Sequence, residues 1–248
     1  MDISKETIGK IQELVLSGVE PREITVGERR GIAIGDHVYW NDRKFPTTLQ
    51  FHTLSGIAEY VNRCLDCEYI TGAPIIQVET EDSVSYYSGA FAPLANRCIL
   101  ASARPRSVES FPFGRFMPCE EFIIKLQALF VPDRGDWQEV VGACAGIKKQ
   151  DGVEYKDSGV TQKVVVQSGL SLSTMKELPN PVVLAPYRTF PEIEQPESSF
   201  VLRVTDGRSG PELALFEADG GAWKLTAMER IKNYLKEEVS RPEMIIIA

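Results

Sequence analysis

Histidine is almost absent from this sequence, with only His37 and His52 among 248 residues. General acid–base catalysis uses histidine more often than any other side chain. His37 lies in an alternating β-type run that favours a surface position, and His52 stands just before a helical segment, where a structural role is expected. Histidine-dependent catalysis is therefore not predicted.

Signatures of the common catalytic and nucleotide-binding sites are missing as well. The chain has no G-x-x-x-x-G-K-[ST] loop, no G-x-G-x-x-G after a strand, no H-E-x-x-H and no G-x-S-x-G. We expect a non-enzymatic protein with no cofactor, no metal and no catalytic residue. An enzyme with a carboxylate-bound metal held by Glu217 and Asp219 is the weakest alternative, because its other ligands would have to come from elsewhere in the chain.

Positive charge and long apolar runs are scarce too. The chain has 27 Lys and Arg against 35 Asp and Glu, for a formal net charge of −8. This balance disfavours nucleic-acid binding, which relies on basic side chains. No apolar stretch approaches the roughly 20 residues that span a bilayer, and the N-terminus has no basic region followed by an apolar run. We expect a cytoplasmic protein without membrane contact.

Cysteine is sparse, with five residues at positions 64, 67, 98, 119 and 144. An odd number without a secretion signal predicts reduced and mostly buried thiols. Cys64 and Cys67 form the only C-x-x-C pair, and a four-ligand zinc site would need His52 and one distant ligand besides them. Core packing is the favoured role, ahead of zinc binding and of a thioredoxin-like redox role.

Hydrophobic periodicity predicts clusters of helices and clusters of strands. Apolar residues recur at helical spacing in segments 4–18, 54–66, 119–130, 136–147 and from 226 onward. In the last of these, the T-x-x-E spacing of Thr226 and Glu229 predicts a capping box. Strand-like runs occupy 31–40, 47–51, 74–80, 83–91, 97–103, 161–172, 181–190, 198–206 and 211–218. Clusters without strict βαβ alternation predict an α+β fold, with largely antiparallel sheet packed with amphipathic helices.

A polar, glycine-containing stretch at 148–159 is the best candidate for a domain boundary or a long hairpin. It would separate an N-terminal α+β half, residues 1–150, from a β-rich C-terminal half, residues 151–248, which ends in a late helix and a terminal strand. One continuous domain is the alternative.

Residues 97–116 combine arginine with phenylalanine. The candidate ligand-binding residues in this segment are Arg97, Arg104, Arg106, Phe111, Phe113, Arg115 and Phe116. Guanidinium groups hold phosphates and aromatic rings stack on bases, so the segment indicates a contact with phosphate, nucleotide or nucleic acid. The alternative, which we favour, is a solvated loop whose phenylalanines fill the core.

Five of the fifteen prolines fall at 179, 181, 186, 191 and 196. Large apolar residues between them argue against a flexible linker, and no pair has the P-x-x-P spacing of an SH3 ligand. We predict an ordered edge strand at 182–190 followed by a rigid extended excursion. Tyr187 and Arg188, from this segment, are further candidates for ligand binding.

The chain ends in "MIIIA" at 244–248. Isoleucine favours strands, and Pro242 stops the preceding helix. We predict that residues 243–247 pair as a strand, within the chain or across a subunit interface. Because a free apolar edge strand invites association, a homo-oligomer is the favoured state.

The segments "VPDRGDWQEVVG", "SGVTQKVVVQSG" and "ALFEADGGAWKLTAMERIKNYL", together with the proline segment, resemble the YfdQ-like family of uncharacterised phage and prophage proteins. The resemblance extends over most of the chain and is strongest at 178–235. It implies a phage origin, and hence the cytoplasm of a host cell, and it carries no active site.

Three functions are compatible with these features. The favoured one is a phage accessory protein that acts in counter-defence by binding, either to a host immune protein or to a nucleotide signal. The first alternative is a role in phage DNA replication or recombination through single-stranded nucleic acid, and the second is the carboxylate-metal enzyme. The net charge of −8 weakens the nucleic-acid alternative.

Overall fold

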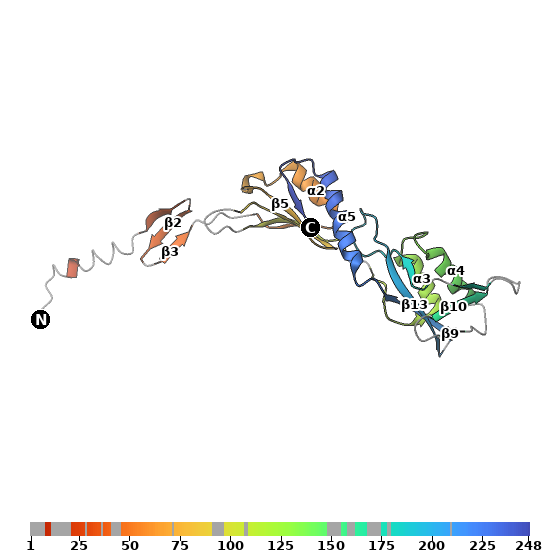
Figure 1. Ribbon diagram of the computed structural model, residues 1–248. Coiled ribbons are helices and arrows are strands. Elements are labelled where there is room, and N and C mark those ends of the chain that lie inside the picture. Colours follow the sequence, from red (N-terminus) through yellow and green to blue (C-terminus); the bar gives the residue numbers. More distant parts are fainter. Residues whose placement is uncertain are drawn as a thin grey trace.

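Two separate hydrophobic cores organise the chain, each between a β-sheet and a pair of helices. The computed structural model describes residues 8–10, 21–27, 29–35, 37–40, 46–70, 72–90, 97–106, 109–147, 155–157, 162–167, 175–177, 180–208 and 210–248. Figure 1 shows the sheet and helices of one core following those of the other along the long direction of the molecule.

The first core lies under a five-stranded mixed sheet with the order β15-β5-β6-β7-β4. Its strands are β4 (Leu49–Phe51), β5 (Ile75–Thr80), β6 (Ser83–Tyr87), β7 (Ile99–Ala103) and β15 (Ile245–Ile247). The central strands β5, β6 and β7 are antiparallel, whereas β4 pairs parallel to β7 and β15 pairs parallel to β5. Alternation places Ile76 and Val78 of β5 in the core and leaves Gln77 half-buried on the opposite face.

Two helices cover one face of this sheet, namely α2 (Leu54–Arg63) and α5 (Ala222–Glu238). Helix α2 buries Leu54, Ile57 and Val61, which confirms the predicted periodicity. The Thr53 hydroxyl caps its N-terminus by accepting the Gly56 N–H at 3.1 Å.

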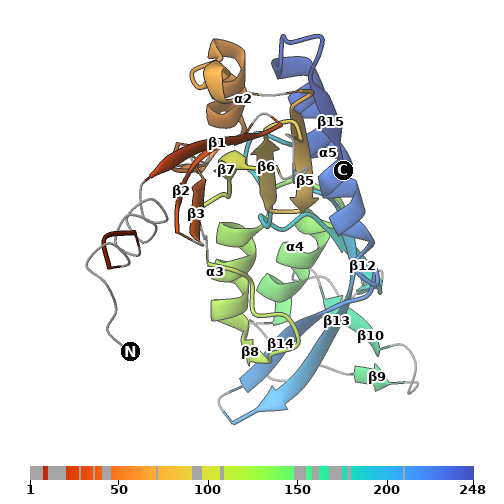
Figure 2. The same cartoon turned by 90° about the vertical axis from the view of Figure 1, so that its left-hand side faces the viewer.

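The second core lies under a four-stranded sheet with the order β12-β13-β14-β8. Its strands are β8 (Met117–Pro118), β12 (Val182–Leu184), β13 (Ser198–Gly207) and β14 (Gly210–Glu217), all antiparallel to their neighbours. Helices α3 (Cys119–Leu129) and α4 (Trp137–Ile147) pack beside one another against it (Figure 2). Phenylalanines dominate this core, with Phe111, Phe122, Phe130 and Phe200 all buried.

The proline segment joins the two cores. The structure describes it from residue 180 onward, and this part is ordered, as predicted. Strand β12 is at the edge of its sheet, which confirms the predicted edge position, although the strand covers only Val182–Leu184. Val182 and Leu184 belong to the second core, whereas Phe190 and Ile193 belong to the first.

Helix α5 begins earlier than the T-x-x-E spacing predicts. Gly220 and Gly221 adopt positive φ angles of 62° and 82°, which turn the chain from β14 into the helix. Asp219 accepts the Gly221 N–H at 3.0 Å and the Trp223 N–H at 3.4 Å. Thr226 therefore lies inside the helix, and the predicted capping box is wrong.

The remaining described strands form two small antiparallel sheets. One contains β1 (Arg22–Val26), β2 (Arg29–Ile34) and β3 (His37–Trp40), and the other β9 (Tyr155–Asp157), β10 (Gln162–Gln167) and β11 (Met175–Glu177). A short 3-10 helix, η1 (Cys67–Tyr69), follows α2. Most of the helix predicted at 4–18 falls outside the described residues.

The fold class is α+β with mostly antiparallel sheets, as predicted. Each core takes residues from both sides of position 150, so the division predicted there does not coincide with the boundary between the cores. Within the described part of the chain, no helix has the length and apolar character to cross a membrane.

Candidate functional site

The arginines predicted to form one binding surface are dispersed. Arg97 precedes β7 and Arg104 follows it, which separates their backbones by roughly 23 Å at 3.3 Å per residue. Arg104 donates from Nε to the Ser83 hydroxyl at 3.3 Å. Arg106 is exposed after β7, whereas Arg115 lies exposed beside the second core.

Two of the three phenylalanines of the same segment, Phe111 and Phe113, pack in the second core, in line with the favoured alternative. Phe111 is buried, and the Phe113 ring stacks on Phe200 with centroids 5.1 Å apart. Phe116 is 39% exposed and meets Phe216 edge-on, with centroids 6.2 Å apart. Among these three candidates, only Phe116 presents much of its ring to solvent.

Arg188 is held inside the protein. Its guanidinium carbon lies 3.7 Å from the Trp223 ring centroid, Nη1 bonds the Glu217 carboxylate at 2.9 Å, and Nη2 donates to the Ser198 hydroxyl. Burial lowers the pKa of Arg188 to about 10, against the opposing effect of Glu217 and Asp219. Neighbouring Tyr187 is 42% exposed, and its N–H donates to Leu129 O at 2.9 Å. Arg188 therefore connects the proline segment to β14 and α5.

A groove runs between α5 and the edge strand β15, which sequence reasoning had not identified as a binding surface. It consists of two shallow hollows of about 290 and 360 Å³ that share Lys236. Their linings are Leu225, Met228, Glu229, Lys232, Asn233, Lys236 and Ala248 in one, and Lys236, Val239, Ser240, Arg241, Pro242, Met244 and Ile246 in the other. We call the two hollows together the edge groove.

Strand β15 forms one wall of the edge groove and is the end strand of its sheet. It pairs with β5 on one side, and no described strand pairs with its other side. Ile245 and Ile247 are 44% and 41% exposed, whereas Ile246 packs against the first core. The prediction of a terminal strand is confirmed, with its partner in the same chain.

A second candidate site lies where α2 ends. Cys64 closes the helix in a left-handed conformation and forms a disulfide with Cys67, which differs from the expected reduced thiols. Arg241 donates from Nη1 to Cys64 Sγ at 2.8 Å and lies 3.8 Å from Cys67 Sγ. Both cysteines are half-buried, whereas Cys119 and Cys144 are buried as predicted.

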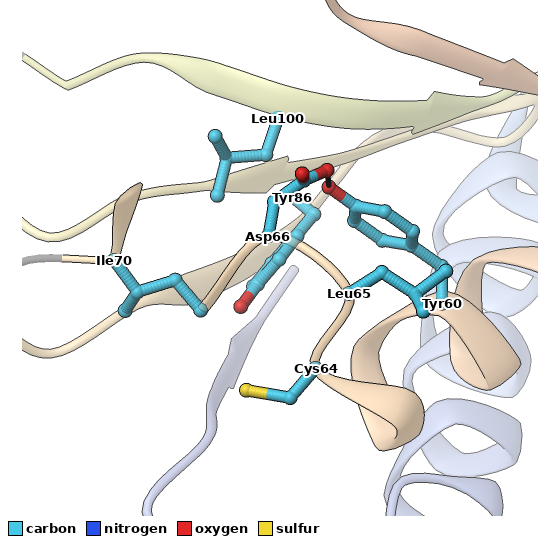
Figure 3. A pocket seen from close by; sticks show the side chains of 7 residues that line it. All are labelled: Tyr60, Cys64, Leu65, Asp66, Ile70, Tyr86 and Leu100. Carbon is cyan, nitrogen blue, oxygen red and sulfur yellow. Dashed lines mark hydrogen bonds between the residues drawn. The ribbon is translucent and has the colours of Figure 1, made fainter. Parts of the chain in front are cut away.

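A small cavity beside the disulfide is lined by two tyrosines, Tyr60 and Tyr86 (Figure 3). The Tyr60 hydroxyl donates to Asp66, and burial together with this bond raises the pKa of Tyr60 well above its usual value. The Tyr86 hydroxyl is buried and has no hydrogen-bond partner among the described residues. The space between the lining side chains leaves no room for a water molecule, so the cavity does not hold a separate ligand.

Comparisons with models of known protein families, with curated proteins and with solved structures find no match. The described residues contain no group of three or more His, Cys, Asp or Glu side chains placed to hold a metal ion.

Proposed function

We propose that this chain is a phage-encoded binding protein that captures an extended, acidic segment of a host defence protein in the edge groove. The observation that carries the proposal is the position of β15, an isoleucine strand at the sheet edge beside a groove lined by lysines. In this mode of recognition, the bound segment adds a strand to an exposed sheet edge.

The geometry of the edge groove supports strand addition. Backbone groups on the outer side of β15 are not bonded to any described strand and can pair with an incoming segment. Helix α5 forms the opposite wall, where Leu225 is 73% exposed and Met228 lines the hollow. Main-chain hydrogen bonds would supply affinity, and alternate apolar side chains of the segment would contact this wall.

The charge of the groove favours an acidic occupant. Lys232, Lys236 and Arg241 line it, against the carboxylate of Glu229 and that of Glu243, which is paired with Arg241. The whole chain carries −8, so this local excess of positive charge runs against the overall balance. Electrostatic complementarity of this kind raises association rates and selects partners.

The biological assignment rests on the resemblance to YfdQ-like phage proteins described above. A phage protein with a peptide-binding edge would act inside the infected cell, where the partners available to it include the host's immune components. The dispersed arginines give no comparable support to binding of single-stranded nucleic acid, which needs a continuous basic track.

Selection from a library of random peptides tests the proposal. We expect enrichment of peptides that combine Asp or Glu with alternating apolar residues, and weaker binding as salt is raised. Ile245→Lys with Ile247→Lys should lower the affinity for the selected peptides more than about tenfold, which corresponds to roughly 1.4 kcal/mol of binding free energy. Ile124→Lys is the matched control, because Ile124 is 59% exposed on α3.

Two outcomes would overturn the proposal. Selected peptides that bind the paired Ile245 and Ile247 variant as tightly as the unmodified protein would place the site elsewhere. Light scattering that shows a dimer, dissociated by the paired substitution but not by Ile124→Lys, would show instead that a second copy of the chain occupies the edge.

A further inference from the structure

We propose that Cys64 and Cys67 form a thiol–disulfide redox site that exchanges two electrons with a protein dithiol. This site adjoins the edge groove, because Arg241 lines one of its hollows as well, but neither proposal depends on the other. In a reducing cytoplasm, C-x-x-C disulfides are typically transient and act in catalysis or redox sensing.

The surroundings of the pair are those of a reactive cysteine. Both sulfurs belong to half-buried residues at the surface end of α2, and Arg241 donates to Cys64 at 2.8 Å. A guanidinium beside a partly exposed cysteine favours the thiolate, which is the nucleophilic form, and it does so here against the carboxylate of Asp66, which lines the adjoining cavity. Glu243 holds the same guanidinium through Nε at 2.6 Å and thereby fixes its position.

Cys119 and Cys144 have the opposite environment, because both are buried. Burial raises the pKa of Cys144 far above its usual value and also raises that of Cys98. Cys119 is buried, and its thiol donates to the Cys144 carbonyl at 3.1 Å. Burial keeps the thiols of Cys119 and Cys144 inert, and Cys98, which is half-buried, is a free cysteine without a disulfide partner. Two-electron redox chemistry should therefore be confined to Cys64 and Cys67.

The distances from Arg241 indicate which sulfur leaves first. A thiolate of the reductant attacks Cys67 Sγ, the Sγ–Sγ bond breaks, and Cys64 departs as a thiolate beside the guanidinium, 1.0 Å nearer to it than Cys67 (3.8 minus 2.8 Å). The second thiol of the reductant then attacks the mixed disulfide, releasing oxidised reductant and the Cys67 thiolate. Two electrons pass to the pair, and two protons from the reductant thiols balance the two sulfurs.

The buried Tyr86 hydroxyl supports the same assignment. It lacks a partner among the described residues in the disulfide form, and an unpaired buried hydroxyl is destabilising. Figure 3 shows this hydroxyl turned away from Tyr60 and Asp66, toward the Cys64 end of the cavity. A Cys64 thiolate would provide there the acceptor that the disulfide form lacks.

Thiol trapping tests the proposal on the full chain. Protein equilibrated in mixtures of reduced and oxidised dithiothreitol is alkylated and weighed by mass spectrometry, with peptide mapping to assign each thiol. We expect Cys64 and Cys67 to become reactive together in one two-electron transition, without alkylation of Cys119 or Cys144. Independent labelling of Cys64 and Cys67, or their full reactivity at every potential, would overturn the proposal.

The role of Arg241 has its own test. With Cys67→Ser in the background, Arg241→Gln should slow alkylation of Cys64 at neutral pH by about tenfold, and Arg241→Lys should restore part of the rate. Arg63→Gln is the control, because Arg63 pairs with Glu59 at 2.7 Å and should leave the rate unchanged. Equal rates in the Arg241→Gln and Arg63→Gln proteins, with unchanged circular dichroism, would contradict the assignment of the leaving thiolate.

Discussion

Arg188 lies over the face of Trp223, with 3.7 Å between the guanidinium carbon and the ring centroid. The two residues come from different parts of the fold, since Arg188 belongs to the proline segment and Trp223 to the first turn of α5. Glu217, at the end of β14, completes the contact at 2.9 Å. Arg188, one of the predicted ligand-binding residues, therefore links the proline segment to β14 and α5.

Arg188→Ala should destabilise the protein. The substitution removes a desolvated cation–π contact and charge-assisted hydrogen bonds, and we expect it to lower the free energy of unfolding by about 2–4 kcal/mol. Urea denaturation followed by circular dichroism measures this quantity. Arg63→Ala serves as the control, because its exposed helical pair with Glu59 should contribute less than about 0.5 kcal/mol. Equal stability of the two variants would mean that the Arg188 network contributes nothing to folding.

The lowered pKa of Asp219 in the folded protein should make the stability depend on pH. Burial raises its pKa, but hydrogen bonds from Ser198, Gly221 and Trp223 outweigh burial, so the net shift is downward. A carboxylate with a lowered folded-state pKa stabilises the fold above its unfolded value of about 3.9, and this contribution is lost as the pH falls through the folded value.

Asp219→Asn should therefore be less stable than the unmodified protein at pH 7, by roughly 1 kcal/mol. The difference should shrink as the pH falls below about 4, where Asp219 of the unfolded chain becomes protonated, and it should be lost as the pH falls through the lower pKa of the folded state. Urea unfolding across this range measures both values, with Glu59→Gln as an exposed control. A difference between the two proteins that stays constant from pH 7 to acid would show that ionisation of Asp219 is not linked to folding.

Substitutions of Phe111 and Phe116 test which residues of the segment predicted to contact a ligand are needed for packing of the core. Phe111 is 4% exposed among three other rings, so Phe111→Ala should cost about 3–5 kcal/mol of stability. Phe116 is 39% exposed, and Phe116→Ala should cost about 1 kcal/mol or less. Thermal unfolding compares them, and a Phe111→Ala protein as stable as the unmodified one would argue against its role in the core.

Local patterns predicted the elements better than their assembly. The spacing of Leu54, Ile57 and Val61 identified α2, because one buried face is a property of the segment itself. The parallel pairing of β4 with β7 depends on contacts between residues about 50 positions apart, and no local signal encodes it. The T-x-x-E spacing placed the start of α5 too late. Two glycines with positive φ turn the chain earlier, so that Asp219, and not Thr226, accepts a backbone N–H at the start of the helix.

The candidate sites were hard to predict for the same reason. Cys64 and Cys67 were visible as a motif, but Arg241 lies 174 positions beyond Cys67, and its contact is what distinguishes a reactive pair from core cysteines. The edge groove depends on the return of β15 to the strand β5, which only the folded chain reveals. By contrast, arginine and phenylalanine are close in sequence at 97–116 and yet separate in space, because β7 extends between Arg97 and Arg104.

Deleting residues 244–248 tests what the terminal strand does. Met244 and Ile246 pack against the first core, so their loss should lower the free energy of unfolding by about 2–4 kcal/mol and the melting temperature by roughly 5–10 °C. Ile245→Lys with Ile247→Lys is the matched control, because it changes only side chains that are 44% and 41% exposed and should leave most of that stability intact.

Light scattering on the same proteins tests the homo-oligomer predicted from the apolar end of the chain. Since β15 already pairs with β5 in its own chain, the fold of one chain does not require a partner at this strand. An oligomer built on the outer edge of β15 should therefore dissociate in the paired lysine variant while each chain keeps its fold. If the truncated protein kept both its oligomeric state and its melting temperature, residues 244–248 would contribute neither to the core nor to association.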